Sequence, residues 1–379
     1  MRIKVNYSEL SKVLGYVNTV LNDKTVDEKM KNIIFLATKE ETLVVGYGGL
    51  TFSRTKISNV EADGFDEVDT WDFQVKAGEL NKIISYYTSL NKTKVENIEF
   101  ELKNDKIGVI VKEEAIKEED SKLTVTSRFT LNNIPILKAV DTEIHLAFPS
   151  DPDVFLSGDL LLYIDSLLPL ATNDGNLTSK ISFGDEHVFI VGNHLNSFFV
   201  NKLPDSFKGV TLGYSSVNFL KKLCEGFDSV EVEKIDRYLC IRSGNTEAFL
   251  KYQPVKIKVD SYIKRLSKDN GIVLDRLYFK DVLKRMMFSA KDGAMKVTEE
   301  GLEVSNEGFY QVIPIINKKG DVDDIKFKAS VPVLSKAILG DDSLFPSEIF
   351  IYFVKAGNGY VIYIKDNTDT WLSNTQVRI

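Results

Sequence analysis

Few side chains in this sequence could perform chemistry on a substrate. The 379 residues include three histidines, His145, His187 and His194, and two cysteines, Cys224 and Cys240. A zinc site needs about four Cys or His ligands at short spacing, and the sequence has no such cluster. Gly-x-Ser-x-Gly, Walker A and His-Glu-x-x-His motifs are also absent. We therefore predict a protein that is not an enzyme and has neither a metal site nor a cofactor, with its histidines in turns or on the surface.

Composition and charge are those of an ordinary globular protein. Charged residues make up 27% and hydrophobic residues 43% of the chain, and 48 basic against 55 acidic residues give a net charge of −7. This balance excludes a protein that is basic all over, but it leaves room for a local basic surface. No apolar run approaches the ~18 residues of a membrane span, and the N-terminal residues alternate like a strand rather than a signal peptide. With only two cysteines, these features predict a cytoplasmic protein that does not bind membranes.

Six amphipathic helices are expected to position the functional side chains. Apolar residues recur at helical spacing in segments 8–21, 77–90, 158–170, 215–225, 277–290 and 330–339. Ser215 and Ser330 are the expected N-caps, and Pro169 should end or kink the third helix. The helix starts are about 64 residues apart on average, which indicates a repeated structural unit.

Alternating strands follow the helices and form antiparallel hairpins. The clearest hairpins join 33–36 with 43–45, 98–102 with 107–111, 230–232 with 238–241, and 349–353 with 360–364. The highly charged segment 112–122 interrupts this rhythm and predicts a solvated loop tip. Two helices and about eight strands suffice for one domain, so we predict an α+β chain of three similar domains, at 1–145, 146–258 and 259–379.

Three short segments add local detail to this order of elements. Thr126–Leu131 precedes Ile134-Pro135 at the end of the first domain, Tyr262–Leu266 opens the third domain, and Asn374–Ile379 ends the chain in an apolar-Arg-apolar tail. Together with the six repeated units, these segments resemble bacterial-type DNA polymerase sliding clamps, the β-clamp family, over essentially the whole chain.

Three segments depart from the family pattern. Gly192–Asn196 stands where family members usually have Asp-Gly-His-Arg-Leu, and Thr375–Val377 stands where they often have Met-Pro-Met. The charged segment 112–122 looks like an insertion. The resemblance is therefore to a divergent clamp, and this divergence would suit a phage-encoded member of the family.

The resemblance implies a topological function without catalysis. Three clamp-type domains, each with two helices packed on antiparallel sheets, would form half of a six-domain ring. Two identical chains would close head to tail, the first domain of one against the third domain of the other, around duplex DNA of any sequence. A clamp loader would place the ring on DNA, and a DNA polymerase held by the ring would replicate processively.

The resemblance also implies that helices line the hole and contact phosphates through a few basic side chains. Without the resemblance, the same residues are typical of the solvent-facing side of amphipathic helices. The third helix has no basic residue and carries Asp159 and Asp165. The predicted DNA-facing residues are Lys12, Lys82, Lys92, Lys221, Lys222, Arg276, Lys280, Lys284 and Lys336.

A second implied site is an apolar groove that holds short peptides of polymerases and loaders. By resemblance it lies between the second and third domains, beside the C-terminal tail. Apolar side chains in a rimmed groove suit peptide recognition, although packing within or between domains would need the same residue types. The predicted lining is Leu177, Leu195, Tyr262, Leu266, Tyr360, Thr375, Val377 and Ile379.

Two other functions remain compatible with the sequence. A clamp-derived regulatory protein could recruit transcription or other machinery to DNA through the same groove. An enzyme on similar repeated sheets, such as a nucleotide-processing hydrolase, is disfavoured because no catalytic set is clustered in the sequence.

Overall fold

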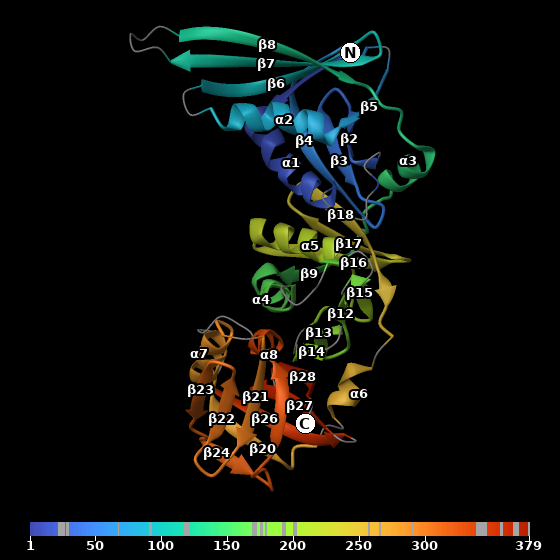
Figure 1. Cartoon of the computed structure of the whole chain (residues 1–379). Coiled ribbons are helices and arrows are strands. Elements are labelled where there is room, and N and C mark those ends of the chain that lie inside the picture. The colour runs from blue at the N-terminus through green and yellow to red at the C-terminus, as the bar shows by residue number, and fades with distance from the viewer. Residues whose placement is uncertain are drawn as a thin grey trace. The chain divides into compact units, whose positions relative to one another are not determined.

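The computed structural model of the chain forms two compact units, which we describe separately (Figure 1). One unit combines Met1–Leu161 with Ser215–Tyr252, and the other combines Leu162–Tyr214 with Gln253–Ile379. The structure describes all residues except 22–26, 28–29, 67, 91–92, 117–121, 169–172, 175–176, 179, 192–194, 200–202, 257, 265–266, 290, 339–346, 357–358, 367–370 and 378–379.

All six predicted helices are present. They are α1 (Tyr7–Leu21), α2 (Ala77–Thr88), α4 (Ser157–Leu167), α5 (Tyr214–Gly226), α7 (Arg276–Met286) and α8 (Val331–Ala337). Two short helices, α3 (Lys138–Ile144) and α6 (Val259–Ile263), were not predicted, because five to seven residues carry too little helical periodicity to be recognised. Ser330 is the N-cap of α8, as predicted. The prediction for Ser215 was wrong, because α5 already begins at Tyr214.

The first unit contains one antiparallel sheet of twelve strands, which runs β8-β7-β6-β1-β4-β18-β17-β16-β9. A branch leaves this path at β4, where β3 pairs with β4, β2 with β3, and β5 with β2. The strands are β1 (Arg2–Asn6), β2 (Asn32–Ala37), β3 (Glu41–Tyr47), β4 (Thr51–Asp63), β5 (Trp71–Lys76), β6 (Thr93–Lys103), β7 (Lys106–Ile116), β8 (Lys122–Asn132), β9 (Asp153–Leu156), β16 (Ser229–Ile235), β17 (Tyr238–Ser243) and β18 (Thr246–Lys251).

Side chains on the two faces of this sheet pack into two separate hydrophobic cores. Phe35 of β2 points into the core beneath α1 and α2, where its ring stacks on Phe73 at 4.7 Å between centroids. The neighbouring Ile34 points to the opposite face, into a core covered by α3. Because side chains along a strand alternate between faces, a sheet that is apolar on both faces must be covered on both.

The second unit contains a ten-stranded sheet in the order β19-β15-β12-β13-β14-β28-β27-β26-β20-β24, a four-stranded sheet β23-β22-β21-β25, and the pair β10-β11. The strands are β10 (Asn173–Asp174), β11 (Leu177–Thr178), β12 (Ile181–Phe183), β13 (His187–Val191), β14 (Leu195–Phe199), β15 (Val210–Leu212), β19 (Gln253–Pro254), β20 (Gly271–Asp275), β21 (Asp292–Val297), β22 (Leu302–Asn306), β23 (Phe309–Ile313), β24 (Asn317–Lys319), β25 (Lys326–Ser330), β26 (Glu348–Ala356), β27 (Gly359–Asp366) and β28 (Trp371–Val377).

The same order of elements occurs three times along the chain. In each copy a strand and a helix are followed by a run of strands, a second helix and three more strands. The run has four strands in the first copy, six in the second, which adds the short pair β10–β11, and five in the third, which adds the short β24. The three copies start at β1, β9 and β20 and end at β8, β18 and β28. This repeat confirms the α+β class with three similar domains. The two compact units follow other limits, so the boundaries 1–145, 146–258 and 259–379 stay a prediction.

The prediction of a charged loop at 112–122 was wrong for most of its length. Residues up to Ile116 continue β7 and Lys122 begins β8, with Lys112 opposite Thr126 and Glu114 opposite Thr124. Charged side chains are tolerated here because Lys112 is exposed and Glu113 and Glu114 are only half-buried, so each can reach water. The remaining residues, 117–121, lie outside the described part.

The histidines also differ in part from the prediction. His145 is exposed at the C-cap of α3, as expected, but His187 is only 8% exposed within β13. β13 therefore begins directly after the turn at 184–186, so that His187 belongs to the strand and not to the turn. His194 lies outside the described residues.

Candidate nucleic-acid interface and partner groove

Four of the predicted DNA-facing lysines lie on helices of the first unit. Lys12 on α1, Lys82 on α2 and Lys222 on α5 are exposed, and Lys221 is half-buried. The Nζ of Lys12 lies 5.8 Å from the centroid of the Phe227 ring. These positions are compatible with phosphate contacts, because each ammonium can reach water while the helix keeps its apolar face on the sheet.

On α7 of the second unit the prediction needs a correction. Lys284 is exposed and Lys280 is half-buried, but Arg276 is only 1% exposed. Arg276 shares the buried stripe of α7 with Phe279 and Leu283, which follow at helical spacing. Its side chain therefore cannot face DNA, and we remove it from the predicted interface.

Two further lysines of that prediction cannot be placed in full. Lys336 lies in α8, but its side chain is outside the described part of the structure. Lys92 is outside the described residues altogether.

A crevice between α1 and α2 is lined by neutral residues, most of them serine, threonine or asparagine, together with Leu14 and Ile84. Ser11, Asn18, Asn81 and Thr88 are among its lining residues. The two asparagine amides donate to each other, at 3.1 and 2.7 Å. Between the charged Lys12 and Lys82, the helices therefore present groups that can accept or donate hydrogen bonds without holding an ion tightly.

The strands of the predicted partner groove are partly brought together in the second unit. β14, β28 and β27 are adjacent, with Leu195 opposite Asn374 and Tyr360 opposite Val377. Thr375 lies between these positions on β28. The half-buried ring of Tyr360 stands 6.3 Å from that of Phe353. For Leu195, Thr375 and Val377 the structure describes the strand but not the side chain.

The other predicted groove residues are not joined to these three strands by any described contact. Leu177 lies in β11 and Tyr262 in α6, each with its side chain outside the described part. Leu266 and Ile379 lie outside the described residues.

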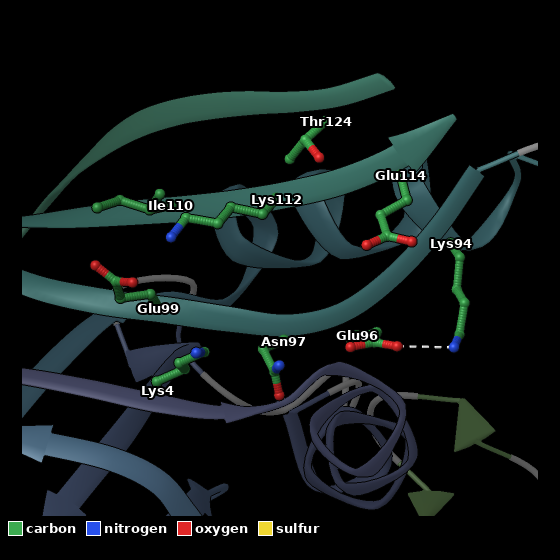
Figure 2. Close-up of a pocket in the computed structure, with 9 residues that line it drawn as sticks. All are labelled: Lys4, Lys94, Glu96, Asn97, Glu99, Ile110, Lys112, Glu114 and Thr124. Carbon is green, nitrogen blue, oxygen red and sulfur yellow. Dashed lines mark hydrogen bonds and ion pairs between the residues drawn. The ribbon is translucent and has the colours of Figure 1, made fainter. Parts of the chain in front are cut away.

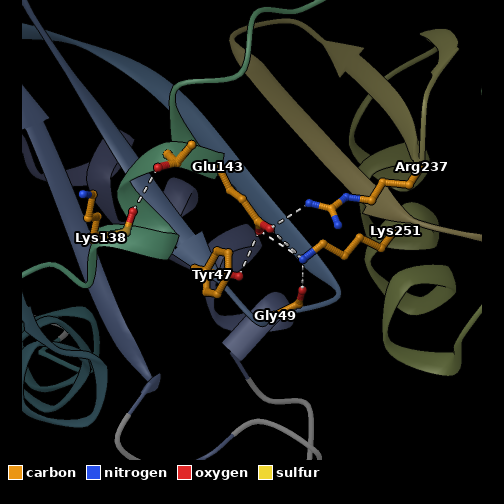
Figure 3. Close-up of polar contacts among 7 residues, drawn as sticks. Tyr47, Gly49, Lys138, Glu143, Arg237 and Lys251 are labelled. Carbon is orange, nitrogen blue, oxygen red and sulfur yellow. Dashed lines mark hydrogen bonds and ion pairs between the residues drawn. The ribbon is translucent and has the colours of Figure 1, made fainter.

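A polar network anchors α3 to the first unit (Figure 3). Glu143 accepts hydrogen bonds from the Tyr47 hydroxyl at 2.9 Å and from the Lys251 ammonium at 2.9 and 3.1 Å. Lys251 also donates to the carbonyl of Gly49 at 2.8 Å, and Arg237 stands 3.5 Å from Glu143. Residues from three separate segments thus contact the carboxylate of Glu143, and these contacts fix α3 against the sheet.

This network shifts the pKa of its members in opposite directions. Burial and the hydrogen bond to Glu143 raise the pKa of Tyr47, and burial together with the charge of Glu143 raises the pKa of Tyr238 to about 12. Burial alone would raise the pKa of Glu143, but the hydrogen bonds from Lys251 and Tyr47 outweigh it and leave the pKa lowered. The carboxylate is therefore held ionised as a structural acceptor.

A second set of charges crosses the strand pair β4–β18. Arg54 donates to Glu247 at 2.7 Å and to the carbonyl of Ile144 at 2.9 Å. Arg242 donates to Glu231 at 2.7 Å and lies 3.9 Å from Glu247. The alternating signs along one row of the sheet favour this particular register of strands.

Exposed apolar side chains gather near one free edge of the second unit. Within the described residues, β23 ends its sheet without a further strand, and Tyr310 on it is 65% exposed. Phe288, just after α7, is 90% exposed, and Met287 beside it is 42% exposed. Sequence reasoning missed these residues, because exposure of an apolar side chain depends on which neighbours the fold supplies.

A polar pocket over β1, β6 and β7 contains charges of both signs (Figure 2). It combines Lys4, Lys94 and Lys112 with Glu96, Glu99 and Glu114, and Lys94 pairs with Glu96 at 2.8 Å. Because charges of both signs balance within it, neither an anion nor a cation is favoured. Among the described residues, no group of three or more His, Cys, Asp or Glu is placed to hold a metal ion.

Comparison with solved structures identifies the fold. The β subunit of DNA polymerase III from Pseudomonas aeruginosa aligns with all of this chain and all of its own, with a TM-score of 0.74 and 14% identity. The chain has the sliding-clamp fold. A putative β subunit from Eubacterium rectale gives a TM-score of 0.75 at 13% identity, covering 100% of this chain and 98% of its own.

A third sliding-clamp structure contains a bound partner segment. The Helicobacter pylori β clamp, solved with a DNA ligase peptide, gives a TM-score of 0.71 at 15% identity, with 100% of both chains covered. No protein-family model and no curated protein sequence matches the chain. None of the described helices of this clamp fold is long and apolar enough to span a membrane.

Proposed function

We propose that this chain is a DNA sliding clamp: two copies close into a ring around duplex DNA and tether a DNA polymerase for processive replication. The observation that carries the proposal is the full-length clamp fold, with a TM-score of 0.74 over 100% of both chains. In this proposal the three domains are 1–145, 146–258 and 259–379. The protein performs no catalysis and has a clamp loader among its partners. It acts in the bacterial cytoplasm, or in the cytoplasm of the host bacterium if it is phage-encoded.

DNA contact in this proposal is electrostatic and independent of sequence. The exposed lysines Lys12, Lys82, Lys222 and Lys284 stand on separate helices, and Lys221 and Lys280 contribute from half-buried positions. Sparse, separated cations attract phosphates without reading bases, so the ring can slide. The net charge of −7 leaves the rest of the surface acidic, which disfavours DNA binding elsewhere.

Partner capture is assigned to the strands β14, β28 and β27 near the C-terminus. The Helicobacter pylori clamp supports this proposal, since its structure holds a DNA ligase peptide. We expect Val377→Asp to abolish binding of a polymerase tail peptide while the dimer stays intact. Isothermal titration with that peptide measures this, and an unchanged dissociation constant would remove Val377 from the groove.

The decisive experiment separates encirclement from simple affinity. The protein is incubated with linear duplex DNA at low salt, both ends are then blocked with a bulky protein, and the salt is raised. At high salt a closed ring stays on DNA with blocked ends and leaves when the ends are opened. A protein held only by electrostatic attraction leaves blocked and open DNA alike. Size-exclusion chromatography with light scattering should show twice the chain mass of 42.8 kDa.

A matched pair of variants controls for folding and for charge. Phe288→Asp places a charge on the most exposed apolar side chain at the free edge, so it should weaken the dimer and abolish retention. Lys284→Ala should reduce binding at low salt but preserve retention on blocked DNA. Loss of wild-type protein from blocked DNA at the same rate as from open DNA would refute the proposed function.

A further inference from the structure

A short segment of the chain covers the sheet of the first unit where β4 meets β18. The two strands pair antiparallel, with Phe52 opposite Phe249. Val140 and Ile144 of α3 are 6% and 0% exposed and pack in the core over these two rings. Because they are four residues apart, they lie on one side of the helix. Together with its flanking apolar residues, α3 forms a cover over this face, which we call the cover segment, residues 136–148.

Side chains of the sheet hold the cover segment by its polar groups. The carboxylate of Glu143 accepts hydrogen bonds from Tyr47 and Lys251, and Arg237 stands 3.5 Å away (Figure 3). The guanidinium of Arg54 donates to the main-chain carbonyl of Ile144 at 2.9 Å. One face of the sheet thus binds both a carboxylate and a peptide carbonyl of the segment that lies on it.

An aromatic residue anchors the end of the cover segment. The ring of Phe148 stands edge-on to that of Phe249, with centroids 6.2 Å apart. The guanidinium carbon of Arg242 lies 4.5 Å from the centroid of the Phe148 ring, which is a favourable cation–π distance. Apolar residues at Ile144, Leu146 and Phe148 face the sheet, whereas His145, between the first two, is exposed.

The backbone of the cover segment does not take part in the sheet. Before it, the Ile134 N–H donates to the carbonyl of Gln74, and after it strand pairing resumes at Asp153 of β9. Among the described residues, no backbone hydrogen bond joins 136–148 to a strand. If the segment moves away, the β4–β18 pairs remain, because their hydrogen bonds run between the strands themselves. A segment held only by side chains can open without unfolding the sheet beneath it.

The second unit has an equivalent junction with a different cover. There β14 pairs with β28, in the same places of their repeats as β4 and β18. Its helix α6 packs Ile263 against Tyr352 and Tyr363, which belong to β26 and β27 and not to the two joined strands. The described packing of α6 therefore lies beside the junction, whereas that of α3 lies on it. The chain itself covers the face whose counterpart we assign to partner capture.

We propose that the face over β4 and β18 is a second peptide-binding site, which the cover segment occupies as an internal ligand and which a partner peptide of the same chemistry can take over. The site lies in the first unit and goes beyond the proposed function, which assigns partner capture to the second unit. The internal ligand defines the partner: a carboxylate, as at Glu143, followed by apolar residues one, three and five positions later, as at 144, 146 and 148.

Charge complementarity selects such a peptide. Lys251 and Arg237 both lie within 3.5 Å of the Glu143 carboxylate, and the Lys251 side chain is only 22% exposed. A peptide without the carboxylate would leave this mostly buried ammonium without its charged partner, which is costly. The site therefore discriminates against neutral apolar peptides by the cation that they leave unsatisfied.

The attachment of the cover segment at both ends explains why the site is closed in the free chain. A tethered ligand is present at an effective concentration on the order of millimolar or above, so a free peptide at micromolar concentration does not replace it. Glu143→Ala removes the carboxylate from the cover segment but leaves Tyr47, Lys251 and Arg237 on the sheet. This variant weakens the internal ligand without changing the site that receives it.

The test supplies the missing carboxylate on a separate peptide. A fluorescein-labelled peptide with the sequence of residues 136–149 is titrated with the full chain, and anisotropy measures the dissociation constant. We expect the Glu143→Ala chain to bind this peptide about 100-fold more tightly than the wild type, because the cover segment opens more readily by about that factor. The same peptide carrying Glu143→Ala should lose this advantage.

Lys251→Ala is the matched control in the chain. It loosens the cover segment through the same hydrogen bonds, but it also removes the ammonium that would receive the carboxylate of the peptide. We therefore expect Lys251→Ala to bind the peptide about tenfold more weakly than Glu143→Ala does. Should Glu143→Ala not fold, Glu143→Gln removes the charge at nearly unchanged volume and is measured in the same way.

Three results would overturn the inference. Equal affinity for the wild type and Glu143→Ala, or for Glu143→Ala and Lys251→Ala, would mean that the peptide binds elsewhere. No binding to a folded Glu143 variant would mean that a separate peptide does not replace the cover segment. Each of these results leaves the proposed function intact, because retention of the wild type on blocked DNA is measured separately. Loss of that retention would refute the proposed function and not the peptide site.

Discussion

Replacing Glu143 by alanine should loosen α3 selectively. The carboxylate is 17% exposed and accepts hydrogen bonds from Tyr47 and Lys251 at 2.9–3.1 Å. Removing one partner of such a charged, mostly buried network costs about 3–5 kcal/mol when no water can replace it. Since Lys251 is 22% exposed and can be partly rehydrated, we expect a loss of about 3 kcal/mol.

The loss is best measured locally, because a chain of several domains does not unfold in one step. Hydrogen exchange of the α3 amides reports the free energy of opening that segment. A loss of about 3 kcal/mol corresponds to roughly 100-fold faster exchange in α3, with little change beneath α1 and α2. Asp141→Ala on the same helix is the matched control.

The control breaks only an exposed pair. Asp141 and His145 lie 3.4 Å apart with exposed fractions of 52% and 56%, so its loss should cost at most about 0.5 kcal/mol. If Glu143→Ala changes exchange no more than Asp141→Ala does, the network does not hold α3 and the reasoning fails.

The effect of Glu143 should also depend on pH. Its pKa in the folded protein lies below the ordinary value of 4.5, so the folded state binds this proton less readily than the unfolded state. The stabilisation is therefore complete above pH 4.5 and is lost as the pH falls through the folded pKa. The difference in exchange between wild type and Glu143→Ala should shrink below pH 4.5, and a constant difference would contradict the assigned pKa shift.

Three further predictions concern the packing. Leu10→Ala, at a fully buried position of α1, should lower the free energy of unfolding of its unit by about 2–5 kcal/mol in urea titrations followed by tryptophan fluorescence. Gly301→Ala should cost about 1–3 kcal/mol, because φ is +154° and a Cβ would clash with the carbonyl of Ile313; a wild-type melting temperature would contradict this strain. Cys224 and Cys240 should not react with a thiol reagent at pH 8 in the folded protein, since burial raises the pKa of each to about 12, whereas rapid labelling would show that the thiols are accessible.

Periodicity alone was sufficient for most of the secondary structure. The helix 8–21 was recognisable because Leu10, Leu14 and Val17 recur on one face, and the structure places all three in the core. Hairpins were equally clear, since alternation and turn residues are local signals. At the turn before β7, Asn104 and Asp105 adopt positive φ values of 51° and 59°, which these residue types tolerate.

The site residues were less predictable than the elements that carry them. Arg276 looked like any basic residue of a helix, but its place beside Phe279 and Leu283 buries it. Phe288 and Tyr310 were not singled out from the sequence, yet among the described residues the fold leaves both exposed near an open sheet edge. Burial depends on neighbours far away in the sequence, which a local pattern does not contain.

The sequence by itself determined the class of elements, their threefold order and the absence of catalytic motifs, because these depend on residue type and spacing. Only the tertiary structure decided which strand edges pair, at β4–β18 and β14–β28, and which edges, β8 and β23, have no further strand in the described part of the chain. Strand pairing depends on contacts between residues far apart in the sequence. Arg54 and Glu247, which face each other across β4 and β18, are 193 residues apart. No local preference specifies such a partner; it follows from packing all three repeats at once.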